Sequence, residues 1–421
     1  MKKKVYWYIV ISIAILALVI FARPVAREIR DAIHAYILEH TDIPKLYFTG
    51  DISEMLEKSD IRKISFKYVD DAQNVEGYAE IRIQGTSSIY YDKKNYTLKF
   101  FEDESFENKL KIDVGWGPQN KYCMKANWID RTQARNVVTA RLAARMQAKY
   151  NLLSQAPNHG LIDGFPVEIF NNGEFLGLYT FNIPKDDWQF GMDSDNPNHI
   201  VICGEGWDPA NLFEDKPDFE TWAVEVGEES DETLEKMNRL FDFVMNSSDE
   251  DFKAHFEEYL NLDSALNYYV MADLAYLKDN LGKNMLIATY DGMIWYLSLY
   301  DLDSSWGTSF DGQSLFEYES TGMDMASNKL FRRMEQAFPG ELAQRYFELR
   351  KDIISNQSIM TEFESFRKEI PEGSFEKEAF RWSPHPNFKW DALPGYDYDQ
   401  IEAFLRCVSD RLDAKYAAWL N

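Results

Sequence analysis

The segment YLKDNLGKNMLIATYDGMIWYLSLYDLDSSWG, residues 276–307, has two apolar runs separated by Asp291-Gly292. Asp-Gly is a strong signal for a two-residue turn, so the segment predicts a β-hairpin in which Tyr290 pairs with Met293. Continuing this pairing along both strands brings the two far ends of the hairpin together. Most of the polar residues of the segment stand at those far ends.

Four polar residues lie at the far ends of the predicted hairpin. Asp279 and Asn284 come at the start of the first strand, and Asp301 and Asp303 follow the second. In the predicted register Asn284 pairs with Leu299, so Asn284 and Asp301 are diagonal neighbours whose backbones lie roughly 7–8 Å apart. Protein kinases carry an Asp, an Asn five residues later, a hairpin and another Asp in this order.

Phosphoryl transfer requires a group that accepts the proton of a hydroxyl and oxygen ligands for Mg²⁺. The spacing therefore predicts Asp279, Asn284 and Asp301 as the catalytic set, with Asp279 as the proton acceptor. Asn284, Asp301 and Asp303 are the candidate metal ligands. Asp and Asn also cap backbone groups at strand ends, and the spacing alone favours that structural interpretation.

Composition limits the class of protein. The chain has 421 residues, of which 45% are hydrophobic and 15% aromatic, which predicts a folded protein with two domains or one bilobal domain. Its formal net charge of −25 disfavours a nucleic-acid partner and suits a basic protein partner, although solubility alone also explains most of the charge. The three cysteines and six histidines are scattered, which favours buried thiols over a zinc site or a disulfide framework.

Residues 1–22 predict a transmembrane anchor. Val5 to Ala22 is uncharged and apolar, nearly long enough to span a bilayer, and has three aromatic residues at one end. A cleaved signal peptide is the alternative, but cutting after Ala22 places the bulky Ile20 where a small residue is required. The short leading tail favours an N-terminus inside and a main domain outside the cytoplasm. Residues 23–45 predict an amphipathic juxtamembrane helix.

The remaining chain predicts an α+β protein with two lobes. Residues 46–189 are rich in strand patterns, including a hairpin around Asn172-Gly173, with one long helix that starts at Asp130. Residues 190–421 are mostly helical, and the hairpin at 276–307 is an island of strand within them. The helices of this second lobe are expected at 231–247, 260–277, 325–338, 340–356 and 398–420.

Four segments resemble the CotH-type atypical protein kinases, the spore-coat family. They are IQGTSSIYYDKKNYTLKF, NWIDRTQARN, EFLGLYTF and the hairpin with its YDLDSSWG end. The resemblance covers roughly residues 80–310, and the four segments occur in the order that the family has. It implies a bilobal kinase-like fold with a β-rich N-lobe, ATP, Mg²⁺ with Mn²⁺ as the alternative, and phosphorylation of serine on a protein.

The resemblance also implies which basic residues contact the nucleotide phosphates. The candidates are Arg82, Lys93, Lys94, Lys99, Arg135 and Asn136. Lys99 is the best analogue of the usual strand lysine, because it points away from the apolar face of its strand. Solvated strand lysines are the alternative, and Asn136 could instead bond the local backbone. Asn182 stands where the family pattern leads us to expect a Glu.

Two functions from different classes follow. The first is a membrane-anchored kinase at a bacterial cell surface, acting on a basic, serine-rich protein substrate. The second is a surface or structural binding protein that keeps the fold without activity. A hydrolase using Glu205 and Asp208 is a third, although such acids more often cap loops. Crowding three carboxylates without a cation is unfavourable, so the acids of the hairpin favour the kinase.

Overall fold

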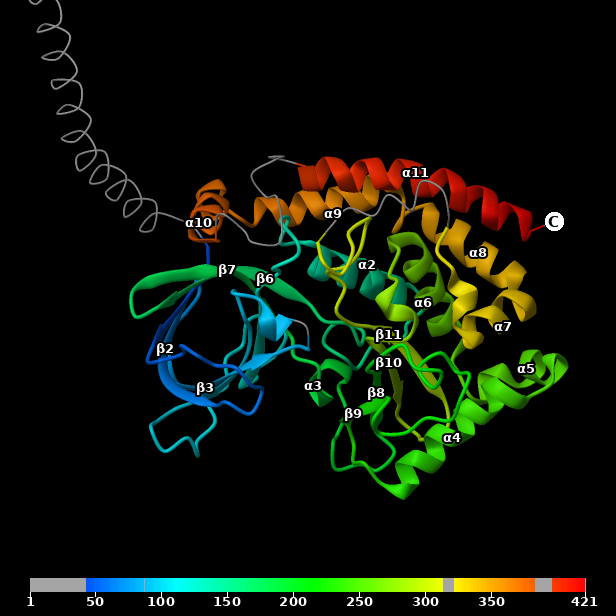
Figure 1. Ribbon diagram of the computed structural model, residues 1–421, viewed down its shortest axis with the longest axis horizontal. Helices are drawn as coiled ribbons and strands as arrows, with labels where there is room; N and C mark the ends of the chain where they lie inside the picture. Colours follow the sequence, from blue (N-terminus) through cyan, green and yellow to red (C-terminus); the bar gives the residue numbers. More distant parts are fainter. Residues whose placement is uncertain (1–42, 87, 313–321, 383–395, 421) are drawn as a thin grey trace, which may run out of the picture.

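The computed structural model describes residues 43–86, 88–312, 322–382 and 396–420 (Figure 1). The predicted anchor at 1–22 and almost all of the predicted juxtamembrane helix lie outside these residues. Within the part of the chain that is described, no helix combines the length and the apolar character needed to cross a membrane.

Seven strands form a closed barrel in the order β1-β2-β3-β4-β5-β7-β6. The barrel closes through the parallel pairing of β1 with β6, and its other pairs are antiparallel. Alternate side chains such as Tyr96, Leu98 and Phe100 of β4 fill its interior. The strands are β1 Lys45–Thr49, β2 Arg62–Val69, β3 Asn74–Gln84, β4 Asn95–Phe101, β5 Lys121–Lys125, β6 Gly164–Asn171 and β7 Glu174–Asn182.

The α+β class is confirmed, but the β-rich part is a closed barrel where the sequence predicted the β lobe of a bilobal kinase. The hairpin at Asn172-Gly173 is also confirmed, since both residues have positive φ angles of 50° and 83°, as a type I′ turn requires. The long helix α2, Arg135–Lys149, packs on α6, Leu262–Ala275, and on α9, Asn356–Lys368, and belongs to the core of the helical part. It begins later than predicted, because Asp130 first closes a turn and then accepts the amide of Arg135 at 2.8 Å.

A second sheet, in the order β11-β10-β8-β9, lies within the helical part (Figure 1). The predicted hairpin supplies β10, Met285–Thr289, and β11, Trp295–Leu299. The sequence analysis missed β8, Ile200–Gly204, and β9, Trp222–Val226. Strand β8 reads as a continuous apolar run because its alternate side chains enter different hydrophobic clusters on the two faces of the sheet.

The predicted register of this hairpin is wrong. Thr289 pairs with Trp295, and a five-residue loop replaces the two-residue turn. The Asp291 carboxylate accepts the amides of Met293 at 2.7 Å and Ile294 at 2.9 Å, and these bonds stabilise the longer loop. The pairing of Asn284 with Leu299 is therefore lost, since Met285 takes that place.

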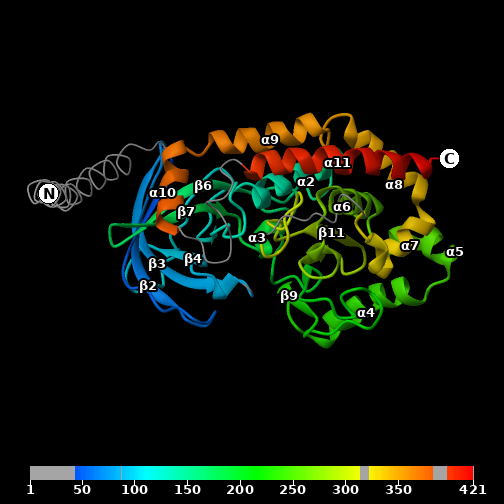
Figure 2. The ribbon, with the colours of Figure 1, turned by 45° about the horizontal axis from the view of Figure 1, so that its top comes forward.

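Residues of α2 and α6 belong to the hydrophobic cluster on one face of the second sheet, whereas Phe190 of α3, Asp187–Phe190, packs on the other face. Helix α11, Tyr396–Ala418, lies beside α9 (Figures 1 and 2). The five predicted helices of this part are present, whereas α5, α9 and α10 were missed. The remaining helices are α3 Asp187–Phe190, α4 Asp231–Asn246, α5 Asp249–His255, α6 Leu262–Ala275, α7 Lys329–Ala337, α8 Pro339–Arg350, α9 Asn356–Lys368, α10 Glu372–Trp382 and α11 Tyr396–Ala418; the 3-10 turns are η1 Ser88–Tyr90, η2 Phe256–Glu258, η3 Asp279–Leu281 and η5 Met325–Ser327.

Candidate active site

The barrel and the second sheet meet at an ion pair. Lys125 ends strand β5 of the barrel, and Asp301 follows strand β11. The Lys125 Nζ lies 3.2 Å from the Asp301 Oδ1, and the two side chains are 9% and 36% exposed. This pair joins two parts of the chain that are 176 residues apart in the sequence.

Asp279, Asp301 and Asp303 form an electrostatically linked group, which we call the acid cluster. Burial raises the pKa of Asp303 to about 8, and the charges of Asp301, Asp130 and Asp279 add to the increase. Burial also raises the pKa of Asp279, with a further contribution from Asp301. Burial opposes ionisation of Asp301, but the charge and hydrogen bond of Lys125 outweigh it and lower the pKa of that carboxyl. At neutral pH the cluster therefore retains a proton.

The backbone at both ends of the hairpin is held in an unusual conformation. Asn284 has a φ of 62° and Asp301 a φ of 55°, values that Asn and Asp tolerate better than most residues. The Asn280 amide donates to the carbonyl oxygen of Tyr300 at 2.8 Å and to that of Asn284 at 3.4 Å. Asn280 thus ties together the two ends that carry the candidate catalytic residues.

Arg135 and Asn136, two of the residues predicted to contact phosphate, form hydrogen bonds to the backbone around the acid cluster. Asn136 is buried, and its Oδ1 accepts the amide of Leu302 at 3.0 Å, between two of the acids. Arg135 is also buried; it pairs with Asp130 and donates to the Ser305 carbonyl oxygen at 3.2 Å. The Arg135 guanidinium is thus engaged with protein groups and the Asn136 amide oxygen accepts a backbone amide, so both residues support the acid cluster; their contact with phosphate stays a prediction.

We expect Arg135→Met to lower the free energy of unfolding by about 3–5 kcal/mol, because it leaves the Asp130 carboxylate buried without its partner. Urea denaturation measures this loss. The matched control on the same helix is Arg145→Met, which removes a more exposed pair with Glu362 and should change stability by about 0–1 kcal/mol. Equal losses in the two variants would contradict the supporting role of Arg135.

The four predicted lysine and arginine contacts of the barrel are dispersed. Arg82 and Lys99 are exposed on its outer surface. Lys94 donates to the carbonyl oxygen of Ile89 at 2.7 Å and holds the loop before β4. Lys93 is fully buried and pairs with a glutamate of helix α10. Lys99 points away from the barrel interior, as the alternation of its strand predicted, and its contact with phosphate stays a prediction.

Sequence reasoning missed the two lysines that lie at the acid cluster. Lys125 and Lys185 both approach the ring of Tyr300, with their Nζ atoms 5.1 Å and 4.7 Å from its centroid. Lys185 follows β7 and lies close enough to Asp301 to lower the pKa of its carboxyl, together with Lys125. The available signal was the segment KYCMK, in which Lys121, Cys123 and Lys125 alternate with core residues.

The loop before β4 also lies near the acid cluster. Burial raises the pKa of Tyr91, and the charges of Asp303, Asp311 and Asp301 add to the increase. Gly85 has a φ of 104°, and a β-carbon there would lie 1.9 Å from the Ser88 Oγ, so this position requires glycine. Gly85 thus opens the loop whose Tyr91 lies near the acids.

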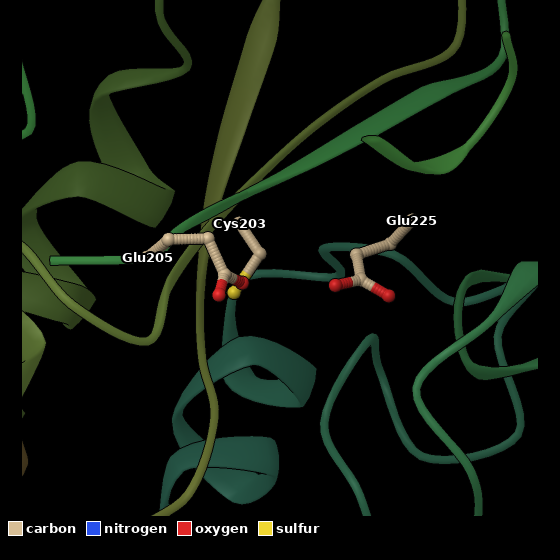
Figure 3. Close-up of side chains that lie close together, drawn as sticks. All are labelled: Cys203, Glu205 and Glu225. Atoms are coloured by element: carbon tan, nitrogen blue, oxygen red, sulfur yellow. The ribbon is translucent and has the colours of Figure 1, made fainter. Parts of the chain in front are cut away.

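A second group of potential ligands lies on β8 and β9. Ligand atoms of Cys203, Glu205 and Glu225 all lie within 4.8 Å of one another (Figure 3). The Lys185 Nζ lies 2.6 Å from the Glu225 Oε1 and 3.4 Å from the Cys203 Sγ. Burial raises the pKa of the Cys203 thiol to about 12, so it stays protonated. These residues therefore hold the lysine ammonium, and Glu205 lies with this group.

Cys123 and Cys203 are buried free thiols, as the sequence predicted, whereas Cys407 is only half-buried where a third buried thiol was expected. Asn182 is buried at the end of β7, and neither its amide oxygen nor its amide nitrogen has a hydrogen-bond partner among the described residues. Its side chain lies over Gly164, where a β-carbon would come within 2.7 Å of the Asn182 Oδ1. The small neighbour explains how the amide fits, and nothing in the structure explains why it is unpaired.

Comparison with known proteins places these observations in a family. No significant match was found among curated proteins. The family model described as CotH kinase protein matches residues 81–406, which run from β3 to α11 and include Lys125, Lys185 and the acid cluster. The match covers most of the chain. The chain belongs to the CotH kinase family.

Proposed function

We propose that this protein transfers the γ-phosphate of ATP to a serine or threonine of a protein substrate, with Mg²⁺ or Mn²⁺ as the metal. The observation that carries the proposal is the acid cluster facing Lys125 across the junction of the barrel and the second sheet. Carboxylates beside a lysine, where two parts of the chain meet, form a site that can hold a metal and a nucleotide together. The family, whose members are kinases, implies ATP and a divalent metal in general.

The donor set fits a hard divalent cation. Asp301 and Asp303 offer carboxylate oxygens, and Asn284, whose carbonyl shares the Asn280 amide with that of Tyr300, offers an amide oxygen. Burial, and after it the charges of the neighbouring acids, raise the pKa of Asp303, and the charge of a bound cation would offset both. When bound, Mg²⁺ would neutralise charge on the phosphates of the nucleotide.

Two further roles, accepting a proton and binding phosphate, fall to Asp279 and Lys125. Asp279 is half-buried and has a raised pKa, which suits the acceptance of a proton from the attacking hydroxyl. Lys125 is held charged, because the attraction of Asp301 outweighs the effect of burial and raises its pKa. A charged lysine in this position can bind a phosphate oxygen of the nucleotide.

The substrate and the location are part of the same proposal. A net charge of −25 favours a basic protein substrate by electrostatic attraction. The apolar segment at residues 1–22 supports attachment to a membrane, with the main domain outside the cytoplasm. The alternative is a binding protein that retains the site without phosphate transfer.

The test is incubation of the full chain in detergent with γ-labelled ATP, Mg²⁺ or Mn²⁺, and a basic serine-rich peptide. We expect label on serine with the wild-type protein and no label with Asp279→Ala. Lys99→Ala, which removes an exposed lysine of the barrel, should behave as the wild type. Nucleotide binding without any transfer under either metal would favour the binding protein instead.

The acid cluster also predicts a pH dependence of stability without metal. Folded Asp303 keeps its proton up to a pKa of about 8, whereas the ordinary value is 3.8, so the folded state binds one more proton between these values. Stability contributed by this group therefore falls as pH rises from about 4 to 8. Thermal unfolding should show that Asp303→Asn raises Tm at pH 8 by about 2 °C or more and changes it less at pH 5. An equal change at both pH values would contradict the assignment.

A further inference from the structure

Helix α10 joins the helical part to the barrel through two buried ion pairs (Figure 2). Its Glu378 lies 2.6 Å from Lys93 of the barrel, with side-chain exposures of 4% and 0%. Its Lys377 lies 2.7 Å from Glu168 of β6, with exposures of 1% and 0%. The pairs have opposite polarity, so each side contributes one cation and one anion.

The first pair reaches the backbone next to Lys125. The Lys93 Nζ donates to the carbonyl oxygen of Ala126 at 2.8 Å and to that of Leu178. The second carboxylate oxygen of Glu378 accepts the amide of Leu178 at 2.7 Å. On its other side, the amide of Ala126 donates to the Asn95 side chain at 2.6 Å. Ala126, the residue that follows Lys125, is thus held at both its N–H and its C=O.

We propose that Glu378 is a positioning residue for Lys125. It pairs with the Lys93 ammonium, which donates to the Ala126 carbonyl oxygen, and so fixes the end of β5 and directs Lys125 toward the nucleotide phosphates. This inference rests on the proposed function. A buried ammonium requires a countercharge, and Glu378 provides it in a ring of otherwise neutral acceptors. Burial lowers the pKa of Lys93, so loss of Glu378 favours either its deprotonation or its movement toward water.

The second ion pair provides a matched control on the same helix. Lys377 and Glu168 are as deeply buried as the first pair, and the Ser374 hydroxyl also donates to Glu168 at 2.7 Å. Glu168 lies on β6, which is separated from β5 by β7 in the barrel, and Lys377 also lies over the ring of Phe175 in β7. Lys377→Met therefore disturbs a buried charge and the docking of α10 to a similar degree, but not through Ala126.

The first measurement requires no nucleotide. Competitive labelling with an amine-acylating reagent, read by mass spectrometry of the full chain, reports how firmly the Lys125 amine is held. We expect Glu378→Gln to increase the labelling of Lys125 about tenfold, which is the size of effect common when a residue that orients a functional group is lost. Lys377→Met should leave it within about twofold of the wild type, as for uncoupled sites.

The second measurement separates positioning from general damage. In the peptide kinase assay, Glu378→Gln should raise KM for ATP about tenfold and leave KM for the peptide within about twofold. If Glu378→Gln does not fold, the double variant Lys93→Met/Glu378→Met carries the test, because replacing both buried charges by apolar groups leaves neither charge unpaired. Its Tm should fall by a few degrees, because the Ala126 and Leu178 carbonyl oxygens lose their buried donor, and the same loss should keep Lys125 labelling raised.

The outcomes are distinct. Lys125 labelling that matches the wild type in a folded Glu378 variant overturns the inference, as does an equal increase in Lys377→Met. A wild-type protein that neither binds ATP nor transfers phosphate would refute the proposed function, and the acylation rates would still decide whether Glu378 positions Lys125.

Discussion

Replacing Asp301 with alanine is expected to lower phosphate transfer by roughly a thousandfold or more, because it removes a metal ligand and the partner of Lys125 in one change. Since positioning and electrostatics supply nearly all the catalysis in phosphoryl transfer, no remaining group can replace both contributions. Initial rates with saturating ATP, and with Mn²⁺ as well as Mg²⁺, measure the loss. Calorimetric titration with Mn²⁺ in the presence of ATP should show that metal binding is lost in parallel.

The control for this variant lies at the other end of the same hairpin. Asp291→Asn removes one negative charge but keeps an oxygen that can accept the amides of Met293 and Ile294. It should retain wild-type activity within about twofold, because it lies far from the acids along both strands. An Asp301→Ala protein that folds and transfers phosphate at the wild-type rate would contradict the assigned role.

Replacing Lys125 with methionine is expected to have the second-largest effect on activity. We expect an activity loss of roughly 10²- to 10³-fold, since a preorganised charge aimed at the phosphates contributes this much in comparable sites. Methionine preserves most of the side-chain length in a position that is only 9% exposed, so the barrel should remain folded. The measurements are kcat/KM for ATP and the Tm of the unliganded protein.

The variant Lys99→Met tests which of two barrel lysines, Lys99 or Lys125, binds the phosphates. Lys99 is exposed on β4, so its replacement should change kcat/KM by less than about twofold. If Lys99→Met were as damaging as Lys125→Met, the nucleotide would extend along β4 as far as Lys99, and the assignment of Lys125 as the phosphate-binding lysine of the barrel would be wrong.

Local patterns accounted for much of the fold. The strands at 62–69 and 95–101 follow from alternation, and the turn at Asn172-Gly173 follows from its two residue types. Closure of the barrel depends on the pairing of β1 with β6, which lie more than a hundred residues apart and carry no local signal. Strand β8 was missed because it is buried on both faces and has no alternation.

The acidic residues of the candidate site could be predicted, because phosphoryl transfer requires such residues in a particular order along the chain. The three acids stand in an order that phosphoryl transfer explains, and the structure places them in one electrostatic group although the predicted register was wrong. The basic residues could not be assigned in the same way. Lys93 is buried because Glu378 arrives from 285 residues later in the sequence, and Lys125 reaches Asp301 only because the barrel packs against the second sheet.

The proposed function requires that the acid cluster and Lys125 form one site for a metal and a nucleotide. Isothermal titration calorimetry of the full chain with ATP, with and without Mg²⁺, tests this most directly. We predict binding with a Kd between about 1 µM and 1 mM when Mg²⁺ is present, and loss of that binding in Asp301→Ala and Lys125→Met. Absence of ATP binding to the wild-type protein with either Mg²⁺ or Mn²⁺, or binding that neither substitution weakens, would contradict it.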